Sequence, residues 1–441
     1  MPLSWKKVNG ELIETLLPFN SVPNILQIGL ISRKFIVTLS NGTSIKHLIF
    51  MSVIHRKYIA LLFCALAICT LCSCIYDYTP ADASLQGLDE PLLVVDGDII
   101  VGDFTKVKLS YTESILEDVE EMPLGCTVMV EAESGETVGA FAVEDEPGVY
   151  LADTRELDLD GKYRLSISVP GRGEFVSEFK PVMISPPIDE ITWSIAPDST
   201  YANVEVTTHN DQEGKLYCKW NYTENWESNA VFIPVLDFNP NTNILRALEI
   251  EEIAERSYCF SEAVSSDISI ANTEKLAENI ISKTVVKHIA NTDLRASGLY
   301  AISVTQKALD KDGYQYWETL KRNIGETGGI FSAQPTELVG NIRSVTNENE
   351  KVVGYISVST SAKMMAFIDW GSTGFFKTEC VYFTMKIDPK YFIKELKTHF
   401  YNGYRPVFMP ETGELLYIST LQCTDCRSYS NSTKPDFWPE K

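Results

Sequence analysis

Side chains that could perform chemistry are sparse in this sequence, and the thiols of Cys423 and Cys426 form the most recognisable pair. A CxxC pair supplies half the ligands of a zinc site, or a redox couple when a thioredoxin-like βαβ unit surrounds it. No two further Cys or His ligands lie at short range, and no βαβ pattern is present. The pair therefore favours a structural disulfide, for which Cys259 and Cys380 are candidate partners.

The other residue types that usually carry catalysis show no catalytic arrangement. His209, His288 and His399 are the three histidines after residue 74, and no two have helical metal-ligand spacing. The sequence contains no HExxH, GxSxG, GxGxxG or P-loop pattern. Acidic runs at 113–121 and 144–146 could place two carboxylates across a cleft, as in glycosidases, but such runs are more typical of solvated loops. We therefore predict no catalytic residue, no metal ligand and no cofactor.

Cys74 has the most specific predicted chemistry. Residues 51–73 show the pattern of a secretory signal, with a basic start at 55–57, an uncharged apolar core at 58–71, and the ending Leu-Cys-Ser-Cys at 71–74. This ending resembles a bacterial lipobox, in which the sulfur of the last cysteine receives a diacylglyceryl group. The apolar core reaches only about 21 Å as a helix, short of the roughly 30 Å needed to span a membrane. We expect a lipoprotein signal peptide and membrane attachment through lipidated Cys74.

The segments around this signal have separate expected roles. Residues 1–50 show no coherent period and are expected to be an upstream extension outside the mature protein, with Met51 as the true start. Residues 74–91 are polar and suit a flexible tether that carries the lipidated cysteine. No later stretch offers 18 consecutive apolar residues, so we expect no other membrane span.

Residues 92–186 predict an Ig-like β-sandwich. Apolar and polar residues alternate at 106–111 and 126–133, which is the period of half-buried strands, and glycine-rich turns separate them. The run 159–165 resembles the tyrosine corner of Ig-like sandwiches, with Tyr163 bonding back to the backbone. A calcium loop using Asp158 and Asp160 is the alternative, but the distal Glu of such a loop is missing.

Residues 187–441 predict a larger β-rich domain that begins after the paired prolines Pro186 and Pro187. Strand patterns continue to 380–387, with short helices expected at 273–283 and from Asp310 to before Gly325. The aromatic residues Trp220, Tyr222 and Trp226 lie in a strand-like run. Their face is expected to be core, with a platform for a ligand as the alternative. The fold class is therefore mainly β with one or two helical insertions.

Composition limits the classes of partner. At 441 residues with 44% hydrophobic content, the chain can form two or three globular domains. Its formal net charge of −22 repels phosphate backbones, so nucleic-acid binding is disfavoured. Six cysteines follow Cys74, and outside the cytosol they could form disulfides, although Cys126, Cys218 and Cys259 could also be buried thiols.

Five segments occur in order after residue 74: LVVDG at 93–97, PPID at 186–189, YQYWETL at 314–320, GIFSAQP at 329–335 running on to GNI at 340–342, and CTDCR at 423–427 with PDFW at 435–438. Together they resemble a family of Bacteroidetes lipoproteins catalogued as domain of unknown function 4249. The resemblance implies an accessory lipoprotein of the outer membrane, of a kind often associated with TonB-dependent receptors that import nutrients. It carries over no catalytic residue.

The sequence therefore predicts a non-enzymatic, lipid-anchored binding or accessory protein of the outer membrane, with an unknown ligand and a TonB-dependent receptor as expected partner. Neither the periplasmic nor the cell-surface face is assigned, because Ile75 and Tyr76 follow Cys74 where surface export in this phylum often uses acidic residues. A glycan or peptide hydrolase is the alternative and would show two carboxyl groups facing each other in a pocket. An adhesin or structural spacer would show no pocket.

Overall fold

The computed structural model describes residues 6–8, 11–13, 91–112, 122–211, 213–325 and 338–440. The chain divides into two units, 1–84 and 85–441. In the first unit, β1 (Lys6–Val8) and β2 (Glu11–Ile13) form an antiparallel hairpin. The predicted signal at 51–73, the lipidation site Cys74, the tether up to residue 90 and the acidic run 113–121 lie outside the described residues. Among the residues that are described, no helix has the length and apolar character needed to cross a membrane.

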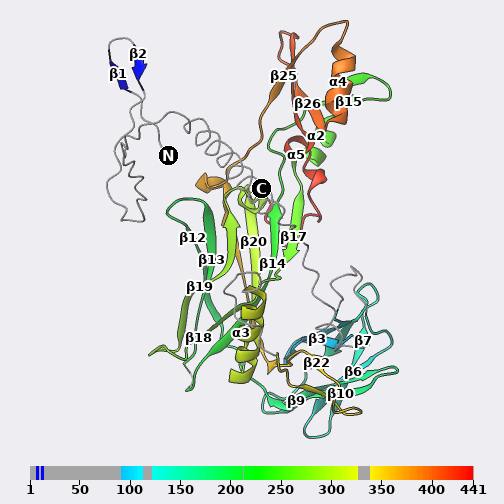
Figure 1. The fold of residues 1–441 in the computed structure, drawn as a ribbon, viewed down its shortest axis with the longest axis vertical. Helices are drawn as coiled ribbons and strands as arrows, with labels where there is room; N and C mark the ends of the chain where they lie inside the picture. The colour runs from blue at the N-terminus through cyan, green and yellow to red at the C-terminus, as the bar shows by residue number, and fades with distance from the viewer. Residues whose placement is uncertain are drawn as a thin grey trace, which may run out of the picture. The chain divides into compact units, whose positions relative to one another are not determined.

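The second unit begins with a β-sandwich (Figure 1). One sheet has the order β3 (Leu93–Gly97), β5 (Phe104–Tyr111), β8 (Val149–Asp153), β7 (Thr137–Ala142). The other has the order β6 (Thr127–Ala132), β9 (Lys162–Val169), β10 (Gly173–Ser177), and β11 (Lys180–Pro181) also pairs with β9. This is the ABED and CFG arrangement of constant-type immunoglobulin domains. Strand β7 pairs with both β6 and β8 and so links the two sheets.

The predicted tyrosine corner is confirmed at the start of β9. The Tyr163 hydroxyl donates a hydrogen bond to the backbone oxygen of Asp158 at 2.8 Å. Gly161 lies against the phenol ring, and a Cβ at this position would overlap it. The Asp158 side chain accepts a hydrogen bond from the backbone N–H of Asp160 at 3.0 Å and so closes the turn.

A late part of the chain, residues 338–359, comes back to the first sandwich and completes it. We call these residues the return segment. Strand β21 (Ile342–Ser344) pairs with β10, β22 (Val352–Val353) pairs parallel with β3, and β23 (Val358–Ser359) pairs parallel with β4 (Ile99–Ile100). Ile356 and Val358 belong to the same apolar core as Leu109 and Phe175. The assignment of all of 187–441 to one domain is therefore wrong for residues 342–359. A strand pattern shows which side of a strand is buried, but not which sheet it joins.

The second sandwich packs a three-stranded sheet against a five-stranded one (Figure 1). The first contains β12 (Ile188–Ile195), β13 (Tyr201–His209) and β19 (Ile280–Ala290). The second contains β14 (Tyr217–Glu227), β17 (Phe260–Val264), β18 (Ser269–Asn272), β20 (Leu299–Ala308) and β24 (Ser361–Asp369). The helix predicted over 273–283 is wrong, because pairing with β13 draws residues from Ile280 onward into β19. The predicted mainly β fold is confirmed.

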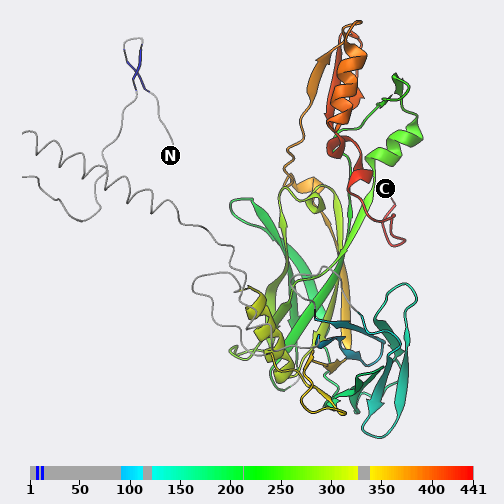
Figure 2. The ribbon, with the colours of Figure 1, turned by 45° about the vertical axis from the view of Figure 1, so that its right-hand side comes forward.

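A third core lies within the second unit and combines two distant parts of the chain. The insertion between β14 and β17 contributes β15 (Leu236–Asn239), β16 (Ile244–Ala247) and α2 (Ile250–Ser257). The C-terminal part contributes β25 (Phe383–Lys386), α4 (Phe392–Tyr401), β26 (Tyr404–Phe408), β27 (Leu415–Thr420) and α5 (Leu421–Thr424). Helix α4 lies along the sheet of β25, β27 and β26 (Figure 2) and buries Leu396 against Leu416 and Ile418. We call this region the C-terminal cap.

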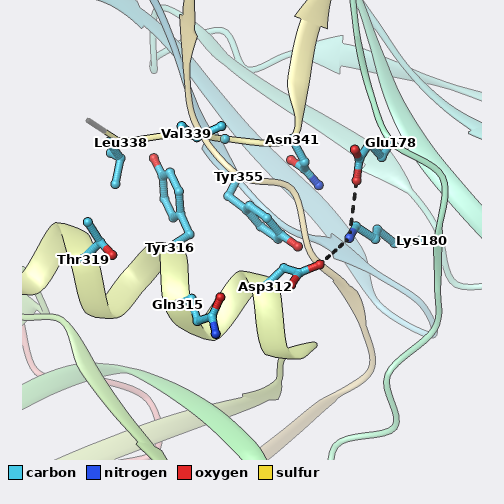
Figure 3. A pocket seen from close by; sticks show the side chains of 11 residues that line it. Glu178, Lys180, Asp312, Gln315, Tyr316, Thr319, Leu338, Val339, Asn341 and Tyr355 are labelled. Atoms are coloured by element: carbon cyan, nitrogen blue, oxygen red, sulfur yellow. Dashed lines mark ion pairs between the residues drawn. The ribbon is translucent and has the colours of Figure 1, made fainter. Parts of the chain in front are cut away.

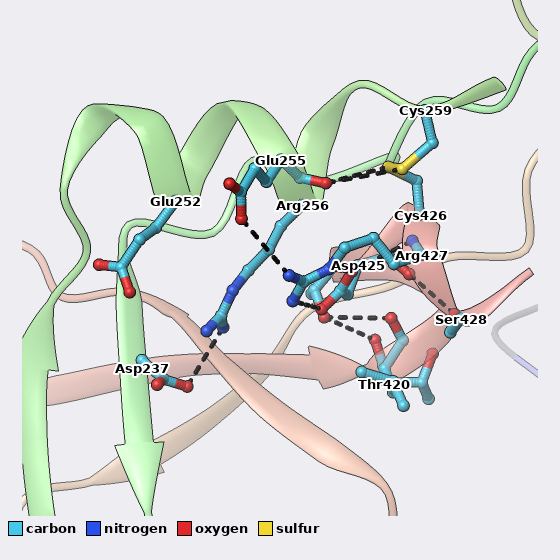
Figure 4. A network of polar contacts seen from close by, with 12 residues as sticks. Asp237, Glu252, Glu255, Arg256, Cys259, Thr420, Asp425, Cys426, Arg427 and Ser428 are labelled. Carbon is cyan, nitrogen blue, oxygen red and sulfur yellow. Dashed lines mark hydrogen bonds and ion pairs between the residues drawn. A yellow bond between two sulfur atoms is a disulfide. The ribbon is translucent and has the colours of Figure 1, made fainter. Parts of the chain in front are cut away.

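Two disulfides stabilise the C-terminal cap. Cys259, directly after α2, is joined to Cys426, and Cys380 is joined to Cys423. Beside the first disulfide, Arg427 donates two hydrogen bonds to the Asp425 carboxylate, at 2.9 and 2.7 Å (Figure 4). The insertion is therefore held to the C-terminal segment by a covalent bond and by the packing around it.

Replacing Ile356, which is 1% exposed, with alanine tests whether the return segment belongs to the first sandwich. We expect Ile356→Ala to destabilise that sandwich by about 2–5 kcal/mol, because it leaves a cavity in the core. Hydrogen exchange of peptides from β9 and β10 measures the effect. Val345→Ala, on the same segment but 49% exposed, is the matched control and should cost less than about 0.5 kcal/mol. Equal exchange in the two variants would contradict the assignment.

Non-reducing peptide mapping should recover Cys259 crosslinked to Cys426 and Cys380 crosslinked to Cys423, with Cys126 and Cys218 as free thiols. The double variant Cys259→Ser, Cys426→Ser should lose about 2–4 kcal/mol, because the unfolded chain is no longer constrained. Denaturant unfolding followed by tryptophan fluorescence measures this loss. Recovery of a Cys423–Cys426 crosslink would contradict the pairing.

Candidate functional site

Helix α3 (Lys311–Gly325) forms one wall of a pocket beside the first sandwich. The Asp310 carboxylate accepts a hydrogen bond from the backbone N–H of Gly313 at 2.9 Å, so the predicted cap of this helix is confirmed. The helix carries the aromatic run predicted at 314–320, and Tyr314 and Tyr316 are both buried. Asp312, Gln315, Tyr316 and Thr319 share the side of the helix that faces the pocket (Figure 3).

The pocket has a volume of about 320 Å³, at the lower end of the range for small-molecule sites. Its walls come from the segment after β10, from α3, and from the return segment (Figure 3). The lining residues are Glu178, Lys180, Asp312, Gln315, Tyr316, Thr319, Leu338, Val339, Gly340, Asn341 and Tyr355. We call this cavity the junction pocket.

Lys180 is the cation of the junction pocket, and carboxylates surround it. Its Nζ lies 3.0 Å from Asp310 Oδ2, 3.4 Å from Glu178 Oε2 and 3.7 Å from Asp312 Oδ2. Burial alone would lower the pKa of Lys180, but its hydrogen bonds to Asp310 and Tyr355 outweigh burial and raise the pKa. Lys180 therefore stays an ammonium group, and the three carboxylates leave its surroundings negative.

Tyr316 is 7% exposed, and its hydroxyl has no hydrogen-bond partner within the part of the chain that the structure describes. Burial, together with the charge of Asp96, raises its pKa to about 12, so the phenol keeps its proton at neutral pH. Its ring lies 5.5 Å from the ring of Tyr355, measured between centroids. The hydroxyl points toward Leu338 and Val339 on the opposite wall (Figure 3). The hydroxyl therefore lines the pocket with its hydrogen-bonding capacity unused by the described residues, and it can bond a ligand.

The wall opposite α3 is fixed by the side chain of Asn341. Its amide donates to the backbone oxygen of Ile356 at 2.9 Å, and its side-chain oxygen accepts from the backbone N–H of Ile356 at 2.8 Å. The backbone oxygen of Asn341 accepts from the N–H of Glu178 at 3.0 Å. At Gly340, a Cβ would overlap the backbone oxygen of Gly354. These contacts hold the wall rigid and leave Asn341 little capacity for a ligand.

A buried charge cluster joins the two sandwiches next to α3. Asp98, from the first sandwich, lies 2.8 Å from Lys307 Nζ and 3.9 Å from Lys219 Nζ, both from the second. Burial alone would raise the pKa of Asp98, but the two ammonium groups outweigh it and lower the pKa to about 2. Lys219 also lies over the indole ring of Trp317 in α3, 3.2 Å from its centroid. The cluster therefore positions α3 against both sandwiches.

The aromatic run predicted as core or as a ligand platform is core. Trp220 is 0%, Tyr222 2% and Trp226 8% exposed. The Trp220 indole donates to the side-chain oxygen of Gln306 at 2.8 Å, and Arg295 lies over the Trp226 ring at 4.2 Å. The platform alternative is therefore wrong, because all three side chains are packed inside the apolar core of the second sandwich.

The structure places the remaining predicted site residues as follows. Cys259, Cys380, Cys423 and Cys426 come together in the C-terminal cap, and Cys259 is not the buried thiol that the sequence also allowed. Cys126 and Cys218 are buried thiols. Within the described ranges, no group of three His, Cys, Asp or Glu side chains could hold a metal ion. Cys74 lies outside these ranges.

Sequence analysis missed most of the junction pocket. Lys180, Asp312 and Tyr355 come from three separate segments, and none of them has a motif around it. The one available signal was the aromatic helix at 314–320, which contains Tyr316.

The fold and the junction pocket define a class of protein in which two β-sandwiches meet at a small-molecule-sized cavity. A family model described as "Domain of unknown function (DUF4249)" matches residues 78–364, and the chain belongs to this family. The match covers the first sandwich, α3, the junction pocket and the second sandwich up to the first part of β24, and it confirms the resemblance to this family. The segment 423–438, which also suggested the family, lies beyond it.

Two further comparisons add little. No curated protein matches the sequence. Among solved structures, the chain is similar to the chicken CNTN1 FN1–FN3 domains, with 12% sequence identity and a TM-score of 0.16. The similarity covers 49% of this chain and 62% of that chain, so less than two thirds of that protein's length is matched. A TM-score this low does not establish a shared fold.

The buried position of Asp98 gives a testable pH dependence. Because its folded pKa lies below the ordinary value, its contribution to stability is complete above about pH 4 and is lost as the pH falls toward 2. We expect the wild-type protein to lose about 2 kcal/mol over this interval through Asp98. In Asp98→Asn, the part of the stability loss between about pH 4 and pH 2 that comes from Asp98 should be absent. The variant should also be less stable than the wild type by about 3–5 kcal/mol at pH 7, since two lysines lose their counter-ion.

Asp103→Asn is the matched control for this experiment. Asp103 also pairs with a lysine of the second sandwich, Lys363, at 2.6 Å, but the two side chains are 37% and 57% exposed. Urea unfolding at pH 7 should show a loss below about 1 kcal/mol for this variant. A loss of stability as large as that of Asp98→Asn would contradict the view that burial makes the ion pairs of Asp98 stronger than the exposed pair of Asp103.

Proposed function

We propose that the protein is a non-enzymatic, lipid-anchored binding component of an outer-membrane nutrient-uptake system and works beside a TonB-dependent receptor. The observation that carries the binding role is the junction pocket, where the Tyr316 hydroxyl lines the cavity and has no partner among the described residues.

The chemistry of the junction pocket supports a binding role more than a catalytic one. Lys180 is held as an ammonium group by Asp310, so it lacks the lone pair that a nucleophile or a general base requires. The Asn341 side chain is already hydrogen-bonded to the backbone of Ile356, and these bonds fix the pocket wall. Among the described lining residues, the other polar side chains are hydroxyl, amide and carboxylate groups, and none is a His or Cys.

Membrane attachment in this proposal rests on the lipobox-like sequence that ends at Cys74. Metabolic labelling with an alkyne palmitate analogue tests it. The wild-type protein and the control Cys72→Ala should both be labelled and recovered in the membrane fraction. Cys74→Ala should lose the label, because its side chain has no sulfur to receive the diacylglyceryl group that carries the labelled acyl chains. Labelling that persists without Cys74 would contradict the anchor.

Affinity purification of the tagged wild-type protein from detergent-solubilised outer membranes tests the receptor partnership. We expect a TonB-dependent receptor in stoichiometric amount, identified by mass spectrometry. An unrelated outer-membrane lipoprotein with the same tag serves as control. Recovery of the protein without any receptor, in repeated purifications under mild detergent, would contradict the uptake role.

A further inference from the structure

We propose that the junction pocket binds a neutral, hydroxyl-rich ligand, of which a single sugar residue is the natural example. This inference rests on the proposed binding function and names the chemistry of its ligand. Three properties of the pocket lead to it: the hydrogen-bonding groups that are free, the apolar surface beside them, and the charge around them.

The free groups of the junction pocket include both donors and acceptors. Tyr316, Gln315 and Thr319 line it from α3, and within the described residues their side chains make no hydrogen bond. The Tyr316 and Thr319 hydroxyls and the Gln315 amide can donate, while the Gln315 oxygen accepts. Glu178 and Asp312 add acceptors at the rim, where their side chains are 63% and 73% exposed. A ligand with several hydroxyl groups satisfies both kinds, because each hydroxyl donates and accepts.

Apolar surface lies between these polar groups. The buried Tyr355 ring forms the floor near Lys180, and Leu338 and Val339 form the wall that the Tyr316 hydroxyl faces (Figure 3). Sugar rings present C–H groups between their hydroxyls and can use such surface, whereas an ion with a full hydration shell cannot. The mixture of surfaces therefore matches a ring with hydroxyls at its edge.

The charges of the junction pocket disfavour an anion. The Lys180 ammonium, the one cation among the described lining residues, is already paired with Asp310 at 3.0 Å. Glu178 and Asp312 remain beside it and would lie close to any bound phosphate or carboxylate, and such like-charge contacts are costly. A simple ammonium ion has only donors, so it would leave the Tyr316 O–H unsatisfied. A neutral ligand avoids both costs.

The experiment uses the full-length protein in detergent and sugars that share one ring but differ in charge. Glucose, galactose, mannose and N-acetylglucosamine are the neutral probes, with glucose 6-phosphate and glucosamine as anionic and cationic counterparts. We expect saturation-transfer NMR and calorimetric titration to show binding of at least one neutral sugar. We expect glucose 6-phosphate to bind at least about tenfold more weakly than that sugar.

Tyr316→Phe tests whether this binding occurs in the junction pocket. It removes only the hydroxyl, which has no partner to lose among the described residues, so the melting temperature should not change. The affinity for the neutral sugar should fall by about tenfold. Tyr314→Phe is the matched control, because Tyr314 lies on the same helix, is similarly buried and does not line this pocket. Its affinity should equal that of the wild type.

Three results would overturn the inference: no binding of any neutral sugar in the panel, equal or tighter binding of glucose 6-phosphate, or unchanged affinity in Tyr316→Phe. Failure of this inference differs from failure of the proposed function. A receptor that copurifies while no sugar binds removes the ligand class and leaves the uptake role. Sugar binding without a copurified receptor leaves the ligand class and removes the uptake role.

Discussion

Lys219 and Lys307 face each other across β14 and β20, as direct partners in the register of the two strands. Two ammonium groups in this position repel each other, and burial makes the repulsion stronger. Asp98 from the first sandwich lies between them and the Trp317 ring covers Lys219, so one carboxylate and one indole make the arrangement tolerable. Because these four residues come from both sandwiches and from α3, their contact fixes the relative positions of the walls of the junction pocket.

Three of the segments that carry the family resemblance lie at this same junction. LVVDG at 93–97 ends directly before Asp98, the run at 314–320 supplies Trp317 and Tyr316, and 340–342 supplies Asn341. They are distant along the chain and have no common chemistry when considered as sequence. In the folded protein, all three lie at or next to the junction pocket. The family match to residues 78–364 covers all three.

Elements that depend on local sequence patterns were predicted, whereas elements that depend on long-range contacts were not. The alternation in β5 and β6, the Tyr163 corner and the Asp310 cap depend on neighbours within a few residues, and each was predicted. The return of residues 342–359 and the change of 280–283 from expected helix to strand depend on partners more than sixty residues away. Propensity is overridden in such places by the partner strand. The junction pocket was not predictable for the same reason.

The return segment also determines when the first sandwich can finish folding. The first strand of this sandwich is β3, yet the partner strand β22 lies some 260 residues later in the chain. A chain that emerges N-terminus first would expose the edges of β3 and β10 until residue 359 arrives. Open edges invite pairing with other chains, so the first sandwich is more exposed to misassembly during synthesis than a sandwich closed by its own consecutive strands.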